Sequence, residues 1–310
     1  MNNPVLVDLA SLMVGVLLLV YGSERTVEAV SSAAYRHGVS TFFVGVTVVA
    51  IGSSIPEIAT SIYGSLYGTG DFVVAHIIGS ATSQITLGIG VIAFATSLTI
   101  PKSKVRRYGG SMLVAMTVML AVVWFGRLGR LEGTLMVAGY LGFLAVRFER
   151  DEYHGVIEQR VDASASPVRL TVRILLAVAM VVVGGHLLVT GAAGVAASLG
   201  APWYLLGIVT GLGTTIPEIS VAISSVYHHE RPIAVGTLLG SNITDPLFSL
   251  GIGAALGGLT IVDPRPAILG TAYMLLASVV VLLVAYQRER FGYAEGVVCV
   301  VLYLPSFLFG

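Results

Sequence analysis

Two copies of one short motif carry the residues best suited to chemistry in this chain. Residues 52–57 read Gly-Ser-Ser-Ile-Pro-Glu, and residues 213–218 read Gly-Thr-Thr-Ile-Pro-Glu. Each copy lies inside an apolar stretch long enough to cross a bilayer, so Glu57 and Glu218 are expected at membrane depth. Ionisable residues there are rare, and they mark ion or substrate pathways. A duplicated half-protein with one carboxylate per copy predicts a transport site at the repeat interface.

The side chains around each glutamate indicate which ligand this site binds. Hydroxyl groups lie three or four positions before each glutamate, so some of them share its helical face. These residues are Ser53, Ser54, Thr214 and Thr215. The proline before each glutamate donates no hydrogen bond, which frees backbone carbonyls in the preceding turn. Carboxylate, hydroxyl and carbonyl oxygens together suit hard cations such as sodium and calcium.

A second pair of segments follows at the same interval. Ser80 returns as Ser241, 161 positions later, which is also the distance from Glu57 to Glu218. Gln84 and Asp245 each lie four positions after their serine and so share its helical face. The predicted site therefore holds two Glu, one Asp and one amide among hydroxyls. With all three acids ionised, one divalent cation, several sodium ions or protons are needed to balance the charge.

The composition predicts an integral membrane protein. Hydrophobic residues make up 55% of the 310 residues, charged residues only 11%, and the mean hydropathy is +0.90. Net charge is zero and no basic block exists, so nucleic acid is not an expected partner. The chain has one cysteine, which excludes an internal disulfide.

Apolar segments recur ten times, five in each half. They are expected near residues 5–29, 41–66, 72–98, 109–126 and 131–147, then 169–198, 203–227, 233–258, 266–286 and 293–309. Their lengths suit membrane helices, some of them tilted or bent. Because five is odd, two homologous halves must insert in opposite senses. The expected fold is thus all-α, with ten transmembrane helices as two inverted five-helix repeats.

Loop charges set the expected orientation, since Lys and Arg concentrate in cytoplasmic loops. With the N-terminus outside, cytoplasmic loops hold 13 of these residues and outside loops hold three, namely Arg127, Arg130 and Arg265. This favours an N-out, C-out chain in the cell membrane. The expected division is a first repeat at 1–148, a cytoplasmic connector at 149–168 and a second repeat at 169–310.

With these motifs in place, the sequence resembles the sodium/calcium exchangers of the calcium/cation antiporter superfamily. That family carries Gly-Thr-Ser-x-Pro-Glu and Gly-Ser-Asn motifs in two inverted alpha-repeats, and the resemblance covers most of this chain. It implies that Glu57 and Glu218 are the central calcium-binding acids. It also implies further ion ligands: Ser53, Ser54, Thr214, Thr215, Ser80, Ser241, Asp245 and Gln84, with the backbone carbonyls of Ala50 and Gly211.

Three departures from the family pattern bear on the counter-ion. Gln84 stands where Asn is common, His76 and Thr237 replace another Asn, and Pro246 directly follows Asp245. Gln84 resembles the cation/proton branch, and a histidine can titrate near neutral pH. A lone intramembrane histidine is more often a hydrogen-bonded packing residue. Sodium is therefore the expected counter-ion, with protons as the alternative.

The expected function is secondary antiport of calcium against sodium by alternating access, without a cofactor. The first and sixth helices, which contain Gly15, Gly22, Gly184, Gly185, Gly191 and Gly194, are candidates for the moving pair. A passive cation channel could use the same acids and is the less favoured alternative. An enzyme is not expected, because neither a Ser-His pairing nor a clustered His/Asp metal motif is visible. The sequence does not indicate an oligomeric state.

Overall fold

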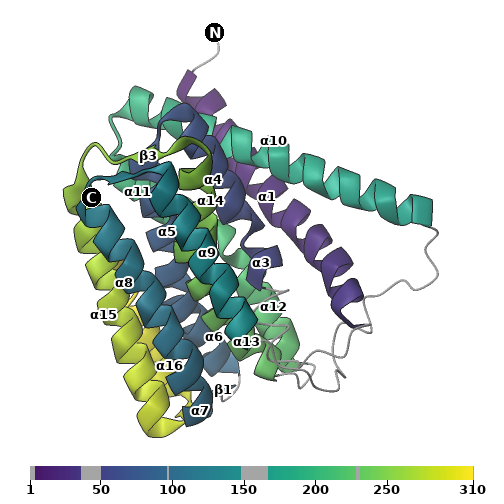
Figure 1. Cartoon of the computed structure of the whole chain (residues 1–310), viewed down its shortest axis with the longest axis vertical. Helices are drawn as coiled ribbons and strands as arrows, with labels where there is room; N and C mark the ends of the chain where they lie inside the picture. Colours follow the sequence, from purple (N-terminus) through teal and green to yellow (C-terminus); the bar gives the residue numbers. More distant parts are fainter. Residues whose placement is uncertain (1–3, 36–49, 96–97, 148–166, 228–230, 310) are drawn as a thin grey trace.

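The computed structural model describes residues 4–35, 50–95, 98–147, 167–227 and 231–309, and these residues form a bundle of helices (Figure 1). Two pairs of two-residue strands are the exception to the predicted all-α fold in this part of the chain. The predicted connector at 149–168 lies almost entirely outside the described residues, as do residues 41–49 of the second predicted segment.

Helices occupy each of the ten predicted apolar segments, wherever those segments are described. The first half contains α1 (Pro4–Tyr35), α3 (Ala50–Ser53), α4 (Ile55–Tyr67), α5 (Gly70–Ser83), the π-helix η2 (Gln84–Gly88), α6 (Ile89–Ala95), α7 (Lys102–Lys104), the π-helix η3 (Val105–Gly109), α8 (Gly110–Trp124) and α9 (Arg130–Arg147). The second half contains α10 (Pro167–Leu199), α11 (Trp203–Thr214), α12 (Ile216–Tyr227), α13 (Arg231–Thr244), the π-helix η5 (Asp245–Ser249), α14 (Leu250–Gly257), α15 (Pro264–Arg288), α16 (Tyr293–Val301) and the 3-10 helix η6 (Leu304–Phe309).

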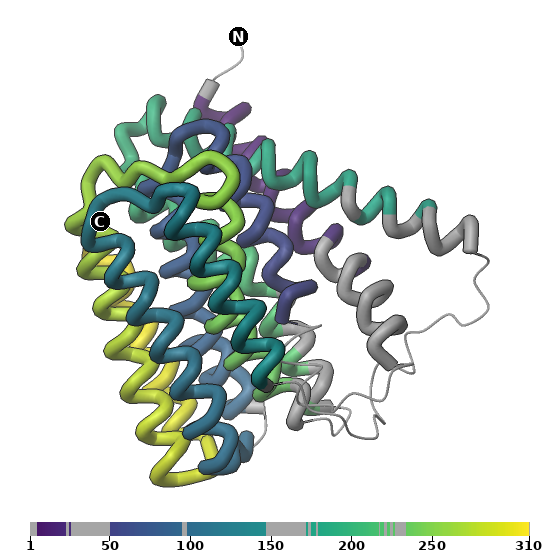
Figure 2. The backbone as a smooth tube through the Cα atoms, in the orientation of Figure 1, coloured from purple at the N-terminus to yellow at the C-terminus, as the bar shows by residue number. Residues whose placement is uncertain are grey.

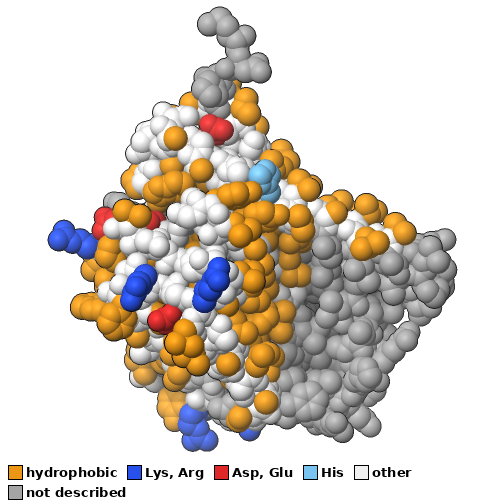
Figure 3. Space-filling model, turned by 45° about the horizontal axis from the view of Figure 1, so that its top comes forward, with side chains coloured by type: hydrophobic (Ala, Val, Ile, Leu, Met, Phe, Trp, Pro, Cys, Tyr) orange, Lys and Arg blue, Asp and Glu red, His pale blue; other side chains and the backbone are white. Residues whose placement is uncertain are grey.

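Five helical stretches in the described residues are long and apolar enough to cross a membrane. They are Val5–Gly22, Gly70–Phe94, Lys102–Trp124, Leu175–Leu199 and Pro264–Arg288. Large apolar side chains point outward from them, including Trp124, which is 65% exposed, and Leu175, which is 63% exposed. Figure 3 shows such side chains in orange on the visible flank, with few charged ones among them. Outward apolar side chains suit a lipid environment.

The two longest helices, α1 and α10, lie side by side along one flank of the bundle (Figures 1 and 2). Glycines allow the close approach. A Cβ atom on Gly15 would lie 2.5 Å from the Leu188 backbone nitrogen, and one on Gly191 would lie 2.5 Å from that of Leu12. Five of the six glycines predicted for the first and sixth helices thus lie where these helices touch, whereas Gly185 faces Tyr63 and Ala59 of α4.

Both halves interrupt their helices at matching positions. Ser54 separates α3 from α4, and Thr215 separates α11 from α12, each two residues before a proline. The π-helices η2 and η5 begin at Gln84 and Asp245, which are 161 positions apart. Since η2 forms without a proline, Pro246 is not needed to produce the matching distortion in η5. Such π-turns are frequent at functional sites.

Short β-pairings join helix ends at opposite ends of the bundle. Strand β1 (Leu98–Thr99) pairs with β4 (Arg290–Phe291), and β2 (Arg127–Leu128) pairs with β3 (Leu259–Thr260). Strands β1 and β3 are separated by the same 161 positions, yet they lie at opposite ends (Figure 1). An inverted relation between the halves places matching elements in this way.

Candidate functional site

The side chains predicted as ligands are gathered in the interior, on the interrupted helices of both halves. All of them have no exposed surface: Ser53, Ser54, Glu57, Ser80, Gln84, Thr214, Thr215, Glu218, Ser241 and Asp245. Buried carboxylates are costly unless hydrogen bonds, opposite charges or metal ions compensate them. The contacts around each acid therefore decide what the site can bind.

Glu57 is held by hydroxyl groups from both halves of the chain. Its Oε1 atom accepts a hydrogen bond of 3.0 Å from Ser80 Oγ on α5 and one of 2.8 Å from Thr214 Oγ1 on α11. Thr214 belongs to the second copy of the motif. The hydrogen bonds to Glu57 therefore do not all come from its own copy. The first glutamate is completed by the second copy, which places the site between the repeats.

Asp245 and Gln84 occupy matching positions in the two repeats and contact each other directly. Gln84 Nε2 donates to Asp245 Oδ2 at 2.9 Å and to Ser80 Oγ at 3.0 Å. Gln84 Oε1 accepts a hydrogen bond of 2.9 Å from Asn242 Nδ2. The amide oxygen expected as an ion ligand is therefore engaged by Asn242, and the amide nitrogen faces the acid. For that oxygen to face a cation beside Asp245, the amide would have to turn over.

His76 lies beside Glu57 and is hydrogen-bonded, as interpreted from the sequence. Its Nδ1 atom lies 3.0 Å from Thr210 Oγ1, and its Nε2 atom lies 3.3 Å from Thr214 Oγ1. The same Nε2 atom is 4.0 Å from Glu57 Oε1. Thr214 thus stands between the imidazole and the carboxylate, and His76 belongs to the surroundings of the predicted site.

The two backbone carbonyls predicted as sodium ligands already accept hydrogen bonds. Ala50 O accepts from the Ser54 backbone nitrogen at 3.0 Å, and Gly211 O accepts from the Thr215 backbone nitrogen at 3.1 Å. Each carbonyl oxygen has a second lone pair, and Thr215 Oγ1 also donates to Gly211 O at 2.8 Å. A Cβ atom on Gly211 would lie 2.3 Å from His76 O, so only glycine fits where α11 crosses α5.

A group of buried oxygens from both halves of the chain has no hydrogen-bond partner among the described residues. They are both carboxylate oxygens of Glu218 and the hydroxyl oxygens of Ser54, Thr237 and Ser241. Leaving such an atom buried and unpaired costs about 1–3 kcal/mol. A bound cation would satisfy these oxygens.

Acidic side chains alone do not form a metal site here. Within the described ranges, no three His, Cys, Asp or Glu side chains are grouped closely enough to hold a metal ion by themselves. A cation between the repeats would need hydroxyl, amide or carbonyl oxygens besides the carboxylates. Sodium and calcium accept such mixed oxygen shells.

Asn242 and Thr210 are contributors that the sequence reasoning did not select. Asn242 orients Gln84, and Thr210 orients His76. Asn242 directly follows Ser241, so a signal existed in the repeated segment. Its counterpart in the first repeat is Ala81, which has no polar side chain. A comparison of the two copies therefore does not select Asn242. Thr210 lies outside both motifs and had no signal.

Comparison with known families agrees with the repeated motifs and the fold. The sequence profile of the family described as sodium/calcium exchanger protein matches residues 7–149 and 169–309. The chain belongs to this family. Both matched ranges contain one Ser/Thr-Ser/Thr-Ile-Pro-Glu motif and one Gly-Ser segment, so the resemblance inferred from the motifs is confirmed.

Relatives of the chain extend over nearly its whole length. The inner membrane protein YrbG of Escherichia coli is 29% identical over 290 residues, which cover 90% of this chain and 89% of the relative. The sodium/calcium exchanger MaX1 of Methanosarcina acetivorans is 26% identical, and the match covers 96% of this chain and 97% of the relative.

A solved structure of the sodium-calcium exchanger NCX_Mj has the same fold. It superimposes with a TM-score of 0.65 at 24% sequence identity, covering 98% of this chain and 99% of that chain. The chain is thus a membrane antiporter of the exchanger family with the helical architecture of NCX_Mj.

Proposed function

We propose that this protein exchanges calcium for sodium across the cell membrane by alternating access. One observation carries the proposal. The interior holds one glutamate from each repeat, together with Asp245, among buried oxygens of which several have no hydrogen-bond partner within the described part of the chain. Family membership and the relative named sodium/calcium exchanger MaX1 support the choice of ions.

Coupling follows from competition for the same oxygens. Calcium would bind between Glu57 and Glu218, because two carboxylates balance one divalent ion. Sodium would bind a carboxylate of the same pair together with neighbouring hydroxyl oxygens. Calcium and its counter-ions cannot all occupy these acids at once. Each movement of the protein therefore carries one kind of cargo, and the two fluxes are linked.

Alternating access needs elements that move against the rest of the bundle. We assign this role to α1 and α10, because they lie together on one flank (Figure 2). The glycines place no side chain at this contact, and Gly15 and Gly184 allow the two backbones to lie close together. Sliding of this pair would open the site to one side while closing it to the other.

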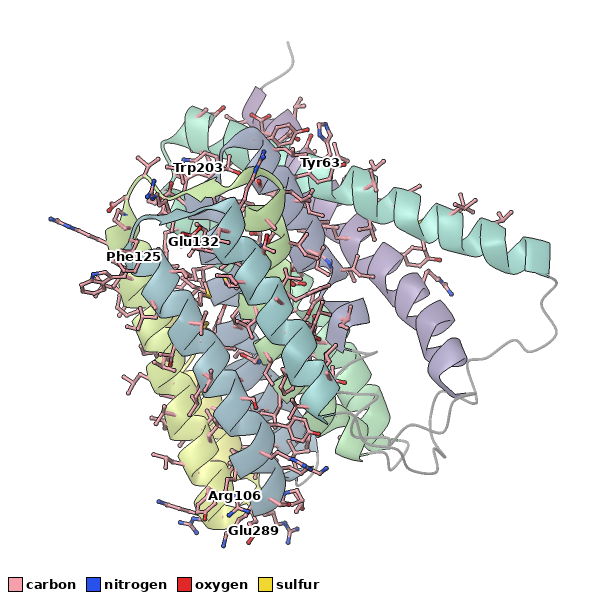
Figure 4. All side chains as sticks on the ribbon, in the orientation of Figure 1. Tyr63, Arg106, Phe125, Glu132, Trp203 and Glu289 are labelled. Carbon is pink, nitrogen blue, oxygen red and sulfur yellow. The ribbon has the colours of Figure 1, made fainter. Side chains whose placement is uncertain are left out.

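The proposed orientation is N-out and C-out, with ten spans in two inverted repeats and residues 149–168 in the cytoplasm. Figure 4 places Arg106 and Glu289 at one end of the bundle, with Glu132 and Trp203 toward the other. The end with Arg106 would face the cytoplasm, because positive residues concentrate there. The proposed second face, near Glu132, carries Arg127 and Arg130.

Calcium/proton exchange is the second candidate. His76, 4.0 Å from Glu57, and the Gln84 contact with Asp245 favour it. A passive cation channel is the third candidate, and its flux would follow the calcium gradient alone. The three candidates differ in what drives calcium movement.

The test is calcium-45 uptake into proteoliposomes with the membrane potential clamped. Uptake is compared under an outward sodium gradient, an outward proton gradient and no gradient. The proposal predicts uptake only with the sodium gradient. Uptake driven by the proton gradient would show that protons, not sodium ions, are the counter-ion. Uptake without either gradient would indicate a channel.

A further inference from the structure

The two halves of the site are matched in position but differ in their hydrogen bonding. Four pairs of residues in the site are separated by 161 positions: Glu57 with Glu218, Ser80 with Ser241, His76 with Thr237, and Ser54 with Thr215. All eight residues are fully buried. Differences between the halves therefore do not arise from exposure to water.

The set formed by Glu57, Ser80, His76 and Thr215, here called the Glu57 set, is hydrogen-bonded both among its members and to α11. Ser80 Oγ donates to Glu57 Oε1 at 3.0 Å, and Thr215 Oγ1 lies 3.2 Å from Ser80 Oγ. His76 bonds with Thr210 and Thr214 through its two ring nitrogens. Only Glu57 Oε2 in this set lacks a partner among the described residues.

The corresponding Glu218 set consists of Glu218, Ser241, Thr237 and Ser54. Ser53 and Ser54 lie near Glu218 and Asp245, respectively, but without a hydrogen bond of good geometry. Both oxygens of Glu218 and the hydroxyl oxygens of the other three residues have no hydrogen-bond partner in the described part of the chain. An unpaired buried acceptor is costly, and a carboxylate more so. Because these five oxygens stand at positions matched to the Glu57 set, we expect them to lie together in the same way, where a cation would satisfy them.

The residue that differs most in size and chemistry between the two sets is His76, opposite Thr237. The imidazole extends to Thr214 and close to Glu57, and its ring nitrogens engage hydroxyl groups of α11. It therefore takes up both the space and the hydroxyl partners that a cation would need beside Glu57. Thr237 is shorter, and its hydroxyl has no hydrogen-bond partner among the described residues.

We propose that the exchanger binds its counter-ions asymmetrically, with a sodium ion in the Glu218 set and none in the Glu57 set, because His76 occupies that place. This inference rests on the proposed sodium/calcium exchange. The Oε2 atom of Glu57, which has no partner among the described residues, remains for the calcium ion that both glutamates share. The chain therefore couples fewer sodium ions to each calcium ion than a site with two open halves.

The His76→Thr variant, which copies Thr237 into the first half, tests this inference. Wild type and variant are reconstituted in proteoliposomes with fixed sodium and calcium gradients. The membrane potential is varied until net calcium-45 flux is zero, and this reversal potential reports how many sodium ions move per calcium ion. The variant is expected to move one additional sodium ion per calcium ion, with a steeper dependence of uptake on sodium concentration.

His186→Thr is the matched control, since His186 is exposed and bonds with Tyr67 at 2.8 Å, away from these residues. It should keep the wild-type reversal potential. The reciprocal variant Thr237→His should close the second set and lose one sodium ion. Equilibrium binding of sodium-22 to the purified variants counts the sites even in a variant that does not transport. If His76→Thr does not fold, Thr237→His decides.

Two results separate this inference from the proposed function. Exchange of calcium for sodium by His76→Thr with the wild-type reversal potential and the wild-type number of sodium sites overturns the inference and leaves the proposed function intact. Absence of sodium-dependent calcium flux in the wild type overturns the proposed function itself.

Discussion

At the scale of single residues, Ser80 is the point where both halves of the site meet. Its hydroxyl lies 3.0 Å from Glu57 Oε1, 3.0 Å from Gln84 Nε2 and 3.4 Å from Asp245 Oδ2. The Ser80 hydroxyl thus contacts Glu57, Gln84 and Asp245 at the same time. Its removal would leave Glu57 Oε1 with one donor fewer and free the amide of Gln84 to shift.

Ser80→Ala is expected to weaken calcium binding about ten-fold, since an unmet buried partner costs about 1–3 kcal/mol and 1.4 kcal/mol is a factor of ten. Calcium-45 binding to the purified protein measures the effect. Ser278→Ala on α15 is the control, because the Ser278 hydroxyl is buried without a partner among the described residues. Equal calcium affinity in the Ser80 and Ser278 variants would contradict the role given to Ser80.

The sequence could predict which residues form the site better than it could predict their contacts. The matched spacing selected Glu57, Glu218, Gln84 and Asp245, and the structure buries all four in the interior. A repeat, however, does not reveal that Thr214 of the second copy bonds to Glu57 of the first. That pairing depends on how α11 crosses α5, which is a property of packing between distant segments.

At the scale of elements, the crossing of α5 and α11 sets the positions of Ser80 and Thr214. A Cβ atom on Gly79 would lie 2.7 Å from both Cα and the carbonyl oxygen of Ile208, and Gly207 and Gly211 face α5 in the same way. Small residues let membrane helices approach closely. Ser80 directly follows Gly79, and Thr214 lies three residues after Gly211. A shift of the two helices at this crossing would therefore move these two predicted ligands apart.

Gly79→Ala should therefore destabilise the protein by about 1–3 kcal/mol through overpacking. Thermal unfolding of the detergent-solubilised protein measures this. Gly139→Ala on α9 is the matched control, because no atom lies within 4 Å of the Cβ it would add. Alanine also favours a helix over glycine, so the control should be neutral or stabilising. A Gly79 variant as stable as the Gly139 variant would show that the crossing tolerates more space than the structure indicates.

Helix existence was predictable from apolar segments, but the distortions within helices were only partly so. The proline before each glutamate indicated that the helices are interrupted near Ser54 and Thr215. The π-turn that begins at Gln84 has no proline or other local signal, and it was missed. Its cause lies in tertiary contacts, since Gln84 must reach Ser80, Asp245 and Asn242 together.

At the scale of the whole molecule, α1 and α10 form one unit packed against the remaining helices. Val16 of α1 faces α11, where a Cβ atom on Gly213 would lie 3.4 Å from Val16 Cγ1. Within the unit, a Cβ atom on Gly22 would lie 3.0 Å from Val181 Cγ2. The first contact joins α1 to α11, and the second joins α1 to α10. Crosslinks at these two contacts therefore distinguish sliding of the pair from packing within the pair.

A disulfide between Val16→Cys and Gly213→Cys should stop exchange, because it ties α1 to the static part of the bundle. The native Cys299 is first replaced by Ala. A disulfide between Gly22→Cys and Val181→Cys lies inside the moving unit and should leave exchange active. Calcium-45 uptake before oxidation, after oxidation and after reduction measures both. Continued exchange in the oxidised Val16/Gly213 variant would exclude α1 as a moving element.

The architecture of the whole chain was the most predictable level, because the repeat of 161 residues, the apolar segments and the Pro-Glu motifs all point to one arrangement. The sequence could not indicate that the two halves of the site differ in hydrogen bonding. His76 and Thr237 stand at equivalent positions in the alignment of the halves. In the structure, His76 is engaged by Thr210 and Thr214, whereas the Thr237 hydroxyl has no hydrogen-bond partner among the described residues.

The most direct measurement of the central claim is sodium-dependent calcium-45 uptake by Glu57→Gln and Glu218→Gln proteins reconstituted beside the wild type. Each substitution keeps the size of the side chain and removes one buried negative charge. Both variants should insert normally and lose exchange, while Glu132→Gln, at an exposed position on α9, should retain it. Wild-type exchange by both buried-site variants would contradict a shared cation site between the repeats.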